Sequence, residues 1–158
     1  MEIHLIRHAH AGSRKGWDGD DRERPLSDRG WTQAQGIEKA LGDVGIDRLW
    51  SSSYIRCLQT LDPLADRLGL EVEVIAPLTE GGSGAEALDL LLYAARSGLT
   101  LAACSHGDVI PAVVATALGR GAQLDGPASA AKGGRYVLRV ADGRVVTVRY
   151  TPPTDRTD

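Results

Sequence analysis

Residues 5–12 of the chain read Leu5-Ile6-Arg7-His8-Ala9-His10-Ala11-Gly12. An apolar run ends abruptly at an arginine and a histidine, and a loop of small residues follows. This pattern predicts a short buried strand whose polar end lies at the carboxyl edge of a sheet, where open α/β folds bind ligands. Arginine carries a fork of donors that fits phosphate, and histidine is a nucleophile or proton carrier near neutral pH. The pair therefore indicates chemistry on a phosphoryl group at this edge.

The composition is that of an ordinary globular protein. The chain has 158 residues, of which 42% are hydrophobic and 25% charged, and this length favours one domain with a sizeable core. The formal net charge of −3 argues against nucleic acid as a partner, because nucleic-acid binding usually needs a basic face. Cys57 and Cys104 both lie in apolar surroundings and are expected to be reduced core thiols.

No targeting segment is visible at the start of the chain, since position 2 is charged and position 7 is an arginine. No apolar run approaches the length that spans a membrane. These features predict a cytoplasmic protein with no membrane partner.

Hydrophobic periodicity predicts strands alternating with helices. Strands are expected at residues 2–7, 47–51, 71–75 and 99–104. Helices are expected from Ser27 to about residue 41, from a cap at Ser53 to Gly69, over 85–97 and over 108–118. Pro63 lies inside the second helix and predicts a kink or interruption there.

The C-terminal part reads as an antiparallel hairpin. Residues 136–140 and 144–148 are rich in valine and flank an Asp-Gly turn, whereas residues 121–134 show no clear period. The predicted fold is therefore of the α/β class, a three-layer α/β/α arrangement. Its sheet is mostly parallel with helices on both faces, and the hairpin adds antiparallel strands. We expect a single domain over residues 1–150 and a flexible tail over residues 151–158.

Three of the predicted strands end in residues of similar chemistry. The first delivers Arg7 and His8, the second is followed by serines and then Arg56, and the fourth by Ser105-His106-Gly107. The carboxyl ends of parallel strands meet at one edge, where helix N-termini add N–H donors suited to phosphate. Two histidines and two arginines converging there would form an anion pocket with a nucleophile inside it.

Five ordered elements of the chain together resemble the histidine phosphatase superfamily, which has the phosphoglycerate-mutase-like fold. They are Arg7-His8-Ala9, Pro25–Gly30 with Gln33-Ala34, Ser52–Thr60, Leu78-Thr79-Glu80 and Ser105-His106-Gly107. The small size and the Arg-Pro-Leu element resemble the short phosphohistidine phosphatases called SixA. The stretches around residues 11–14 and 19–26 also resemble the phosphatase half of mycobacterial two-domain Nudix proteins.

The resemblance implies a catalytic role for each of the converging residues. His8 would attack phosphorus and become a phosphohistidine, while Arg7, Arg56 and His106 would surround the phosphoryl oxygens. Glu80 would be the general acid, with Glu86 as the alternative, although acids in glycine-rich loops are often merely solvated. The scheme requires no metal and no cofactor.

Other features concern the rim of the expected pocket. Ser13, Arg14 and Arg24 are candidate substrate-binding residues that approach from a loop. His10 replaces the acidic residue commonly found two positions after the nucleophile, and we expect it at the rim. The segment between the third strand and His106 is short where larger relatives insert a helical cap, which implies an open site.

The resulting hypothesis is a metal-independent phosphatase that acts on a phosphorylated partner through a phosphohistidine on His8. An open pocket suits a bulky substrate, so phosphohistidine on a protein is the first expectation. A nucleotide or another small phosphate ester is the alternative. A non-catalytic module that binds phosphorylated ligands is a further possibility, although binding alone would need only arginines and backbone donors.

Overall fold

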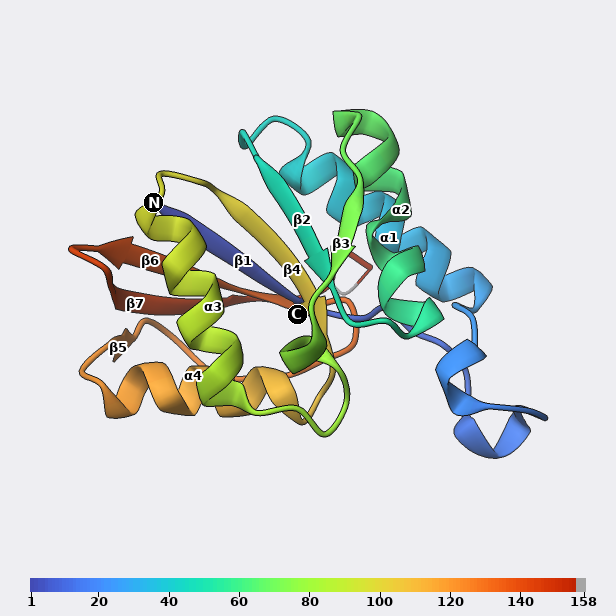
Figure 1. Ribbon diagram of the computed structural model, residues 1–158. Coiled ribbons are helices and arrows are strands. Elements are labelled where there is room, and N and C mark those ends of the chain that lie inside the picture. The colour runs from blue at the N-terminus through green and yellow to red at the C-terminus, as the bar shows by residue number, and fades with distance from the viewer. Residues whose placement is uncertain (156–158) are drawn as a thin grey trace.

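A seven-stranded sheet forms the centre of the computed structural model, which describes residues 1–155 (Figure 1). The strand order is β3-β2-β4-β1-β6-β7-β5. The strands are β1 Glu2–Arg7, β2 Arg48–Ser51, β3 Val72–Val74, β4 Leu101–Ser105, β5 Gln123–Leu124, β6 Arg135–Ala141 and β7 Arg144–Thr151. Strands β1 to β4 are mutually parallel, so their carboxyl ends lie at one edge, as the alternation of strands and helices predicted.

The hairpin of β6 and β7 extends the sheet beside β1, and β6 runs antiparallel to both neighbours. Asp142 and Gly143 at its tip have φ angles of 53° and 73°, which the turn of a two-residue hairpin requires and which aspartate and glycine tolerate. Strand β5 is a two-residue addition beside β7 that periodicity did not predict.

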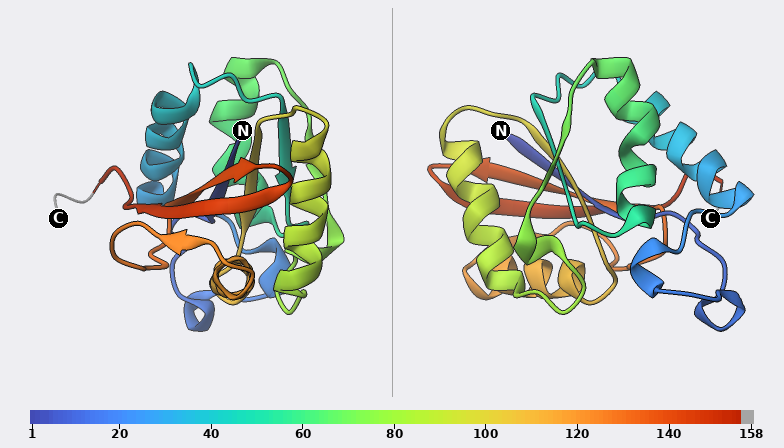
Figure 2. Two further views of the ribbon diagram at one scale, coloured as in Figure 1. Left: turned by 90° about the vertical axis from the view of Figure 1, so that its left-hand side faces the viewer. Right: turned by 45° about the vertical axis from the view of Figure 1, so that its right-hand side comes forward.

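Helices cover both faces of the sheet (Figure 2). Helices α1 (Asp28–Leu41) and α2 (Ile55–Leu68) pack on one face, and α3 (Gly84–Arg96) and α4 (Val109–Gly119) on the other. Alternating residues of β1 enter the two cores, with Leu5 packed towards α3 and α4 and Ile6 towards α1 and α2. Both side chains are fully buried, so the central strand is fixed from both sides before it ends at Arg7.

Two details of helix α2 differ from the expectation. Its N-cap is Tyr54, not Ser53, and the cap makes no side-chain hydrogen bond. Instead, the Ser52 hydroxyl accepts from the Tyr54 N–H at 3.2 Å, one residue earlier than predicted. The helix also runs without interruption through Pro63 and ends at Gly69, whose φ of 65° is left-handed as predicted.

Residues 151–155, expected to belong to a flexible tail, lie along helix α1. Strand β7 reaches Thr151, Pro153 is buried, and Asp155 accepts from Arg29 Nε at 2.9 Å and from Gln33 Nε2 at 3.0 Å. The rest of the proposed tail, residues 156–158, lies outside the described residues.

Candidate active site

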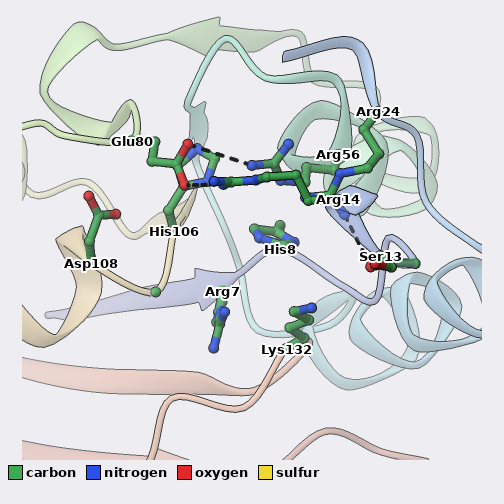
Figure 3. A pocket seen from close by; sticks show the side chains of 12 residues that line it. Arg7, His8, Ser13, Arg14, Arg24, Arg56, Glu80, His106, Asp108 and Lys132 are labelled. Atoms are coloured by element: carbon green, nitrogen blue, oxygen red, sulfur yellow. Dashed lines mark hydrogen bonds and ion pairs between the residues drawn. The ribbon is translucent and has the colours of Figure 1, made fainter. Parts of the chain in front are cut away.

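A cavity of about 490 Å³ opens at the carboxyl ends of the parallel strands (Figure 3). Its lining includes every residue that the sequence proposed as catalytic or substrate-binding: Arg7, His8, Ser13, Arg14, Arg24, Arg56, Glu80 and His106. It also includes Gly12, Gly107, Asp108 and Lys132. Glu86, the alternative acid, lies exposed in the first turn of α3 and is not part of this lining.

Backbone hydrogen bonds continue the sheet beyond its strands and fix the loops that carry these side chains. The His8 N–H donates to the Ser105 carbonyl at 3.0 Å, and the Ser52 N–H donates to the Cys104 carbonyl at 3.1 Å. The segments that carry the two histidines are thereby aligned by main-chain contacts.

The ring of His8 is oriented by its own chain. Its Nδ1 lies 2.8 Å from the Ala9 carbonyl oxygen, which only accepts, so Nδ1 carries the proton and Nε2 keeps its lone pair. The Ala9 N–H in turn donates to the Thr60 hydroxyl at 2.9 Å. Burial, followed by the positive charges of Arg56 and Arg7, lowers the pKa of His8 to about 3. The imidazole is therefore a neutral nucleophile at physiological pH.

The lowered pKa of His8 has a consequence for stability. In the unfolded chain this histidine titrates near 6.5, so between pH 6.5 and 3 the unfolded state binds the extra proton and folding becomes less favourable as the pH falls. We expect the variant His8→Asn to lose less stability than the parent protein over this range. Urea midpoints of both proteins at pH 7 and pH 4.5 measure the difference, and equal losses would contradict the expectation.

His106 faces His8, with ring centroids 5.4 Å apart. Side chains from the segment after β2 and from α2 contact its ring. Its Nε2 lies 2.8 Å from the Ser52 hydroxyl and 3.6 Å from the Cys57 sulfur, and its ring packs edge-on against Tyr54. The Ser52 hydroxyl also accepts from the Tyr54 N–H, so one side chain links the His106 ring to the start of helix α2.

Three buried nitrogen atoms of the pocket residues have no hydrogen-bond partner within the described chain. They are Arg7 Nε, Arg56 Nε and His106 Nδ1. Buried polar groups are almost always paired in native proteins. The two Nε atoms belong to guanidinium groups that line the cavity, where their positive charge would attract an anionic ligand.

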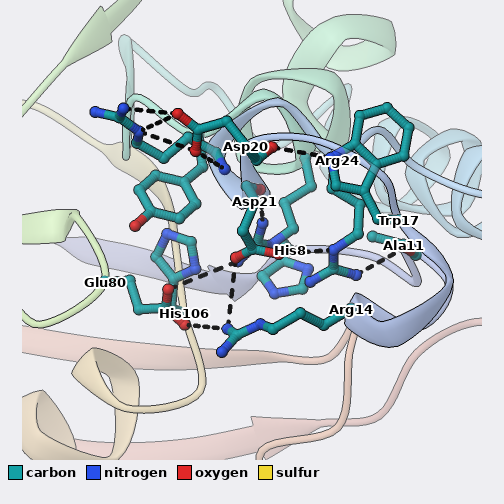
Figure 4. Close-up of polar contacts among 12 residues, drawn as sticks. His8, Ala11, Arg14, Trp17, Asp20, Asp21, Arg24, Glu80 and His106 are labelled. Atoms are coloured by element: carbon teal, nitrogen blue, oxygen red, sulfur yellow. Dashed lines mark hydrogen bonds and ion pairs between the residues drawn. The ribbon is translucent and has the colours of Figure 1, made fainter.

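Arg56 is almost fully buried, at 1% exposure. It is bound by the turn that carries Asp20 and Asp21 (Figure 4), which sequence reasoning placed in solvent. Its Nη1 donates to the Asp21 carbonyl at 2.7 Å, and its Nη2 donates to the Asp21 carboxylate at 3.1 Å. Adjacent aspartates in a charged loop carry no signal for such a contact. Only the neighbouring Asp20, which binds the exposed Arg22, is solvated as expected.

The loop cations differ in what they contact. Arg14 is largely exposed and lies 3.2 Å from Glu80 and 3.4 Å from Asp21. Arg24 is buried; its Nη1 donates to the Ala11 carbonyl at 2.8 Å and its Nε to Asp21 at 2.9 Å. Both arginines line the cavity. The donors of Arg24 are used in hydrogen bonds that hold the loop, whereas the exposed guanidinium of Arg14 is accessible to a ligand.

Arg7 packs directly beneath Gly107. A Cβ at position 107 would lie 2.7 Å from the guanidinium carbon of Arg7, so glycine here allows the close approach. The Nη1 of Arg7 donates to the Ala130 carbonyl, which ties the cation to the segment before β6.

Other residues lie differently from what the sequence suggested. His10, expected at the rim, does not line the cavity, and its Nδ1 lies 2.6 Å from the Ser27 hydroxyl at the start of α1. Asp108, which sequence reasoning missed, accepts from the Gly81 N–H at 2.7 Å and so holds the loop that follows Glu80.

Within residues 1–155, no group of three or more histidine, cysteine or acidic side chains is arranged to hold a metal ion. No helix of this part of the chain has the length and apolar character needed to cross a membrane.

A family model described as the histidine phosphatase superfamily (branch 1) matches residues 3–87, more than half of the chain. The chain belongs to this superfamily. An 8-oxo-(d)GTP phosphatase of Mycolicibacterium smegmatis is 34% identical over 155 residues, which cover 96% of this chain and 48% of that protein. The chain thus spans about half the length of this curated relative.

Solved structures show the same fold. The histidine phosphatase SixA complexed with tungstate superposes with a TM-score of 0.77 at 21% identity, covering 96% of this chain and 95% of that one. A putative phosphohistidine phosphatase SixA from Agrobacterium tumefaciens gives a TM-score of 0.72 at 21% identity, covering 96% and 97% of the two chains. A mycobacterial glucosyl-3-phosphoglycerate phosphatase gives 0.69 at 18% identity, covering 96% and 97%. At these identities the likeness concerns the fold, which was predicted correctly.

Proposed function

We propose that this chain is a phosphatase that works in two steps through a phosphohistidine on His8. The observation that carries the proposal is the neutral His8 ring, with Nδ1 bonded to Ala9, facing the donors of Arg7, Arg56 and His106 in one cavity. An oriented lone pair beside unpaired N–H groups is suited to attack phosphorus and to offset the charge on its oxygens.

In the first step His8 Nε2 attacks phosphorus, and the bond from phosphorus to the leaving atom breaks. Glu80, at the cavity wall, gives its proton to the leaving atom. In the second step Glu80 takes a proton from water as the water oxygen attacks the phosphohistidine. The N–P bond breaks, inorganic phosphate leaves, and His8 is neutral again. The two arginines and His106 supply the charge stabilisation that the transfer needs, so the scheme operates without a metal.

Trapping of the intermediate tests this proposal. Enzyme mixed with a radiolabelled phosphate ester and quenched in alkali, where phosphohistidine survives, should carry label on the peptide that contains His8. Label that binds but is never covalently attached, with no phosphate released, would instead support the non-catalytic binding module.

For the substrate, we propose small phosphorylated molecules, with nucleotides among them. In support, the relative with 34% identity is named for a nucleotide, whereas the SixA structures share only 21%. Phosphohistidine on a protein, the first expectation from the sequence, is the second candidate, and the likeness to SixA favours it. Values of kcat/KM for a phosphohistidine peptide, nucleotides and sugar phosphates distinguish the two.

A further inference from the structure

Lys132 is a cavity cation that the mechanism above leaves unused. It lies in the segment before β6, and in Figure 3 its side chain extends towards His8 beside Arg7. Arg14, Arg24 and Arg56 each have a carboxylate partner, whereas the Lys132 ammonium has no ion pair or hydrogen bond within residues 1–155. A cation that faces a cavity without a partner is available to an anionic ligand.

The main chain around Lys132 is fixed to the end of β1. The Gly133 N–H lies 3.2 Å from the carbonyls of both Arg7 and His8, and the Gly134 carbonyl accepts from the Arg7 N–H at 3.0 Å. The Lys132 carbonyl accepts from Gln33 Nε2 at 3.3 Å. Gly133 has a φ of 83°, and a Cβ there would lie 2.9 Å from the Gln33 side chain, so glycine is needed for this turn. These hydrogen bonds thus hold the main chain of Lys132 at the pocket.

The charged groups that shift the pKa of Lys132 are all cations. Partial burial, followed by the positive charges of Arg7, Arg24 and Arg56, lowers the pKa of its ammonium. Asp21 already pairs with Arg24 and Arg56, whereas Arg7 and Lys132 have no carboxylate partner within residues 1–155 and are open to an anion in the cavity. One phosphoryl group already has Arg7, Arg56 and His106 as donors, so Lys132 can serve a second anionic group.

We propose that Lys132 binds a second phosphate carried by the leaving group, so that the preferred substrate is a diphosphate whose terminal phosphoryl group is removed. This inference rests on the proposed function and names its substrate class. For a nucleoside diphosphate, His8 Nε2 bonds to the terminal phosphorus, and the bond from that phosphorus to the bridging oxygen breaks. The bridging oxygen keeps the electron pair, takes the Glu80 proton and leaves as part of the nucleoside monophosphate, whose phosphate contacts Lys132. Water then releases inorganic phosphate from His8.

The variant Lys132→Gln tests the inference with three substrates: ADP, AMP and 4-nitrophenyl phosphate. Losing a charged hydrogen bond to the second phosphate should lower kcat/KM for ADP by roughly 10- to 100-fold. The other two substrates lack that phosphate and should be hydrolysed almost as by the parent protein. Comparing variant with parent on each substrate removes the difference in reactivity between anhydride and ester. Lys39→Gln, an exposed lysine of helix α1, is the matched control and should change none of the three.

The other possible results distinguish a failure of this inference from a failure of the proposed function. An equal loss on all three substrates would place Lys132 on the transferred phosphoryl group and overturn the inference. No loss on ADP, or a parent enzyme that hydrolyses 4-nitrophenyl phosphate but not ADP, would overturn it while leaving the proposed function intact. If the parent hydrolyses none of them, and no label is trapped on His8, the proposed function fails as well. Lys132→Arg, which keeps the charge, should restore part of the ADP activity.

Discussion

Replacing His8 with alanine is expected to reduce kcat/KM for 4-nitrophenyl phosphate by roughly 10⁴- to 10⁶-fold, the range seen when a covalent nucleophile is removed from other hydrolases. The arginines and His106 remain in the variant and can still bind phosphate, so KM should change much less than kcat. The remaining rate would come from water attacking a bound substrate directly. Steady-state kinetics with enough enzyme to detect slow turnover provide the measurement.

The control for this variant is His10→Ala, two residues along the same loop. The His10 ring is bonded to Ser27 and does not line the cavity, so its loss should leave most of the activity. Both variants should unfold at temperatures that allow assay at 25 °C, because a folded His8→Ala protein is needed to assign the loss to chemistry. A His8→Ala protein that turns over at the parental rate would overturn the phosphohistidine mechanism.

The residues at the strand ends were predictable because their positions follow from local patterns. Apolar runs mark the buried strands, and parallel strands bring Arg7, His8 and His106 to one edge whatever the details of the loops. Arg56 follows from the same topology, since it lies in the first turn of the helix after β2. The hairpin was equally clear, because an Asp-Gly pair between valine-rich runs has few other structures available to it.

The contacts that tune the site were not predictable from the sequence. Asp21 reaches Arg56 only because the loop before α1 folds back over helix α2. The path of that loop places Asp21 against Arg56 and leaves its neighbour Asp20 paired with Arg22. Lys132 lies in a stretch with no hydrophobic period, and long-range hydrogen bonds to Arg7, His8 and Gln33 place it. The position of the His106 ring depends on a contact with the Ser52 hydroxyl, more than fifty residues away in the chain. Each of these is a tertiary contact that leaves no periodic pattern in the sequence.

The variant Arg56→Ala is expected to lower kcat by roughly 10²- to 10³-fold, as when one donor to a developing negative charge is removed elsewhere. Arg56 Nε is buried without a partner and the guanidinium is held rigidly by Asp21, so its position requires no rearrangement when phosphate arrives. Arg56→Lys should recover only part of this activity, because an ammonium cannot bind both Asp21 and a phosphoryl oxygen with the geometry of the planar fork.

The variant Asp21→Asn, alone and combined with Arg56→Ala, tests whether Asp21 acts by positioning Arg56. In Asp21→Asn the carbonyl contact to Arg56 Nη1 remains, whereas the carboxylate contact to Nη2 is weakened. If Asp21 only positions Arg56, this variant should lose much less in kcat than Arg56→Ala, and the double variant should lose no more than Arg56→Ala alone. Additive losses would show that Asp21 acts independently of Arg56, for instance through its contacts with Arg14 and Arg24. Arg48→Ala, which removes an exposed arginine paired with Glu73 on β2 and β3, is the control and should leave kcat unchanged.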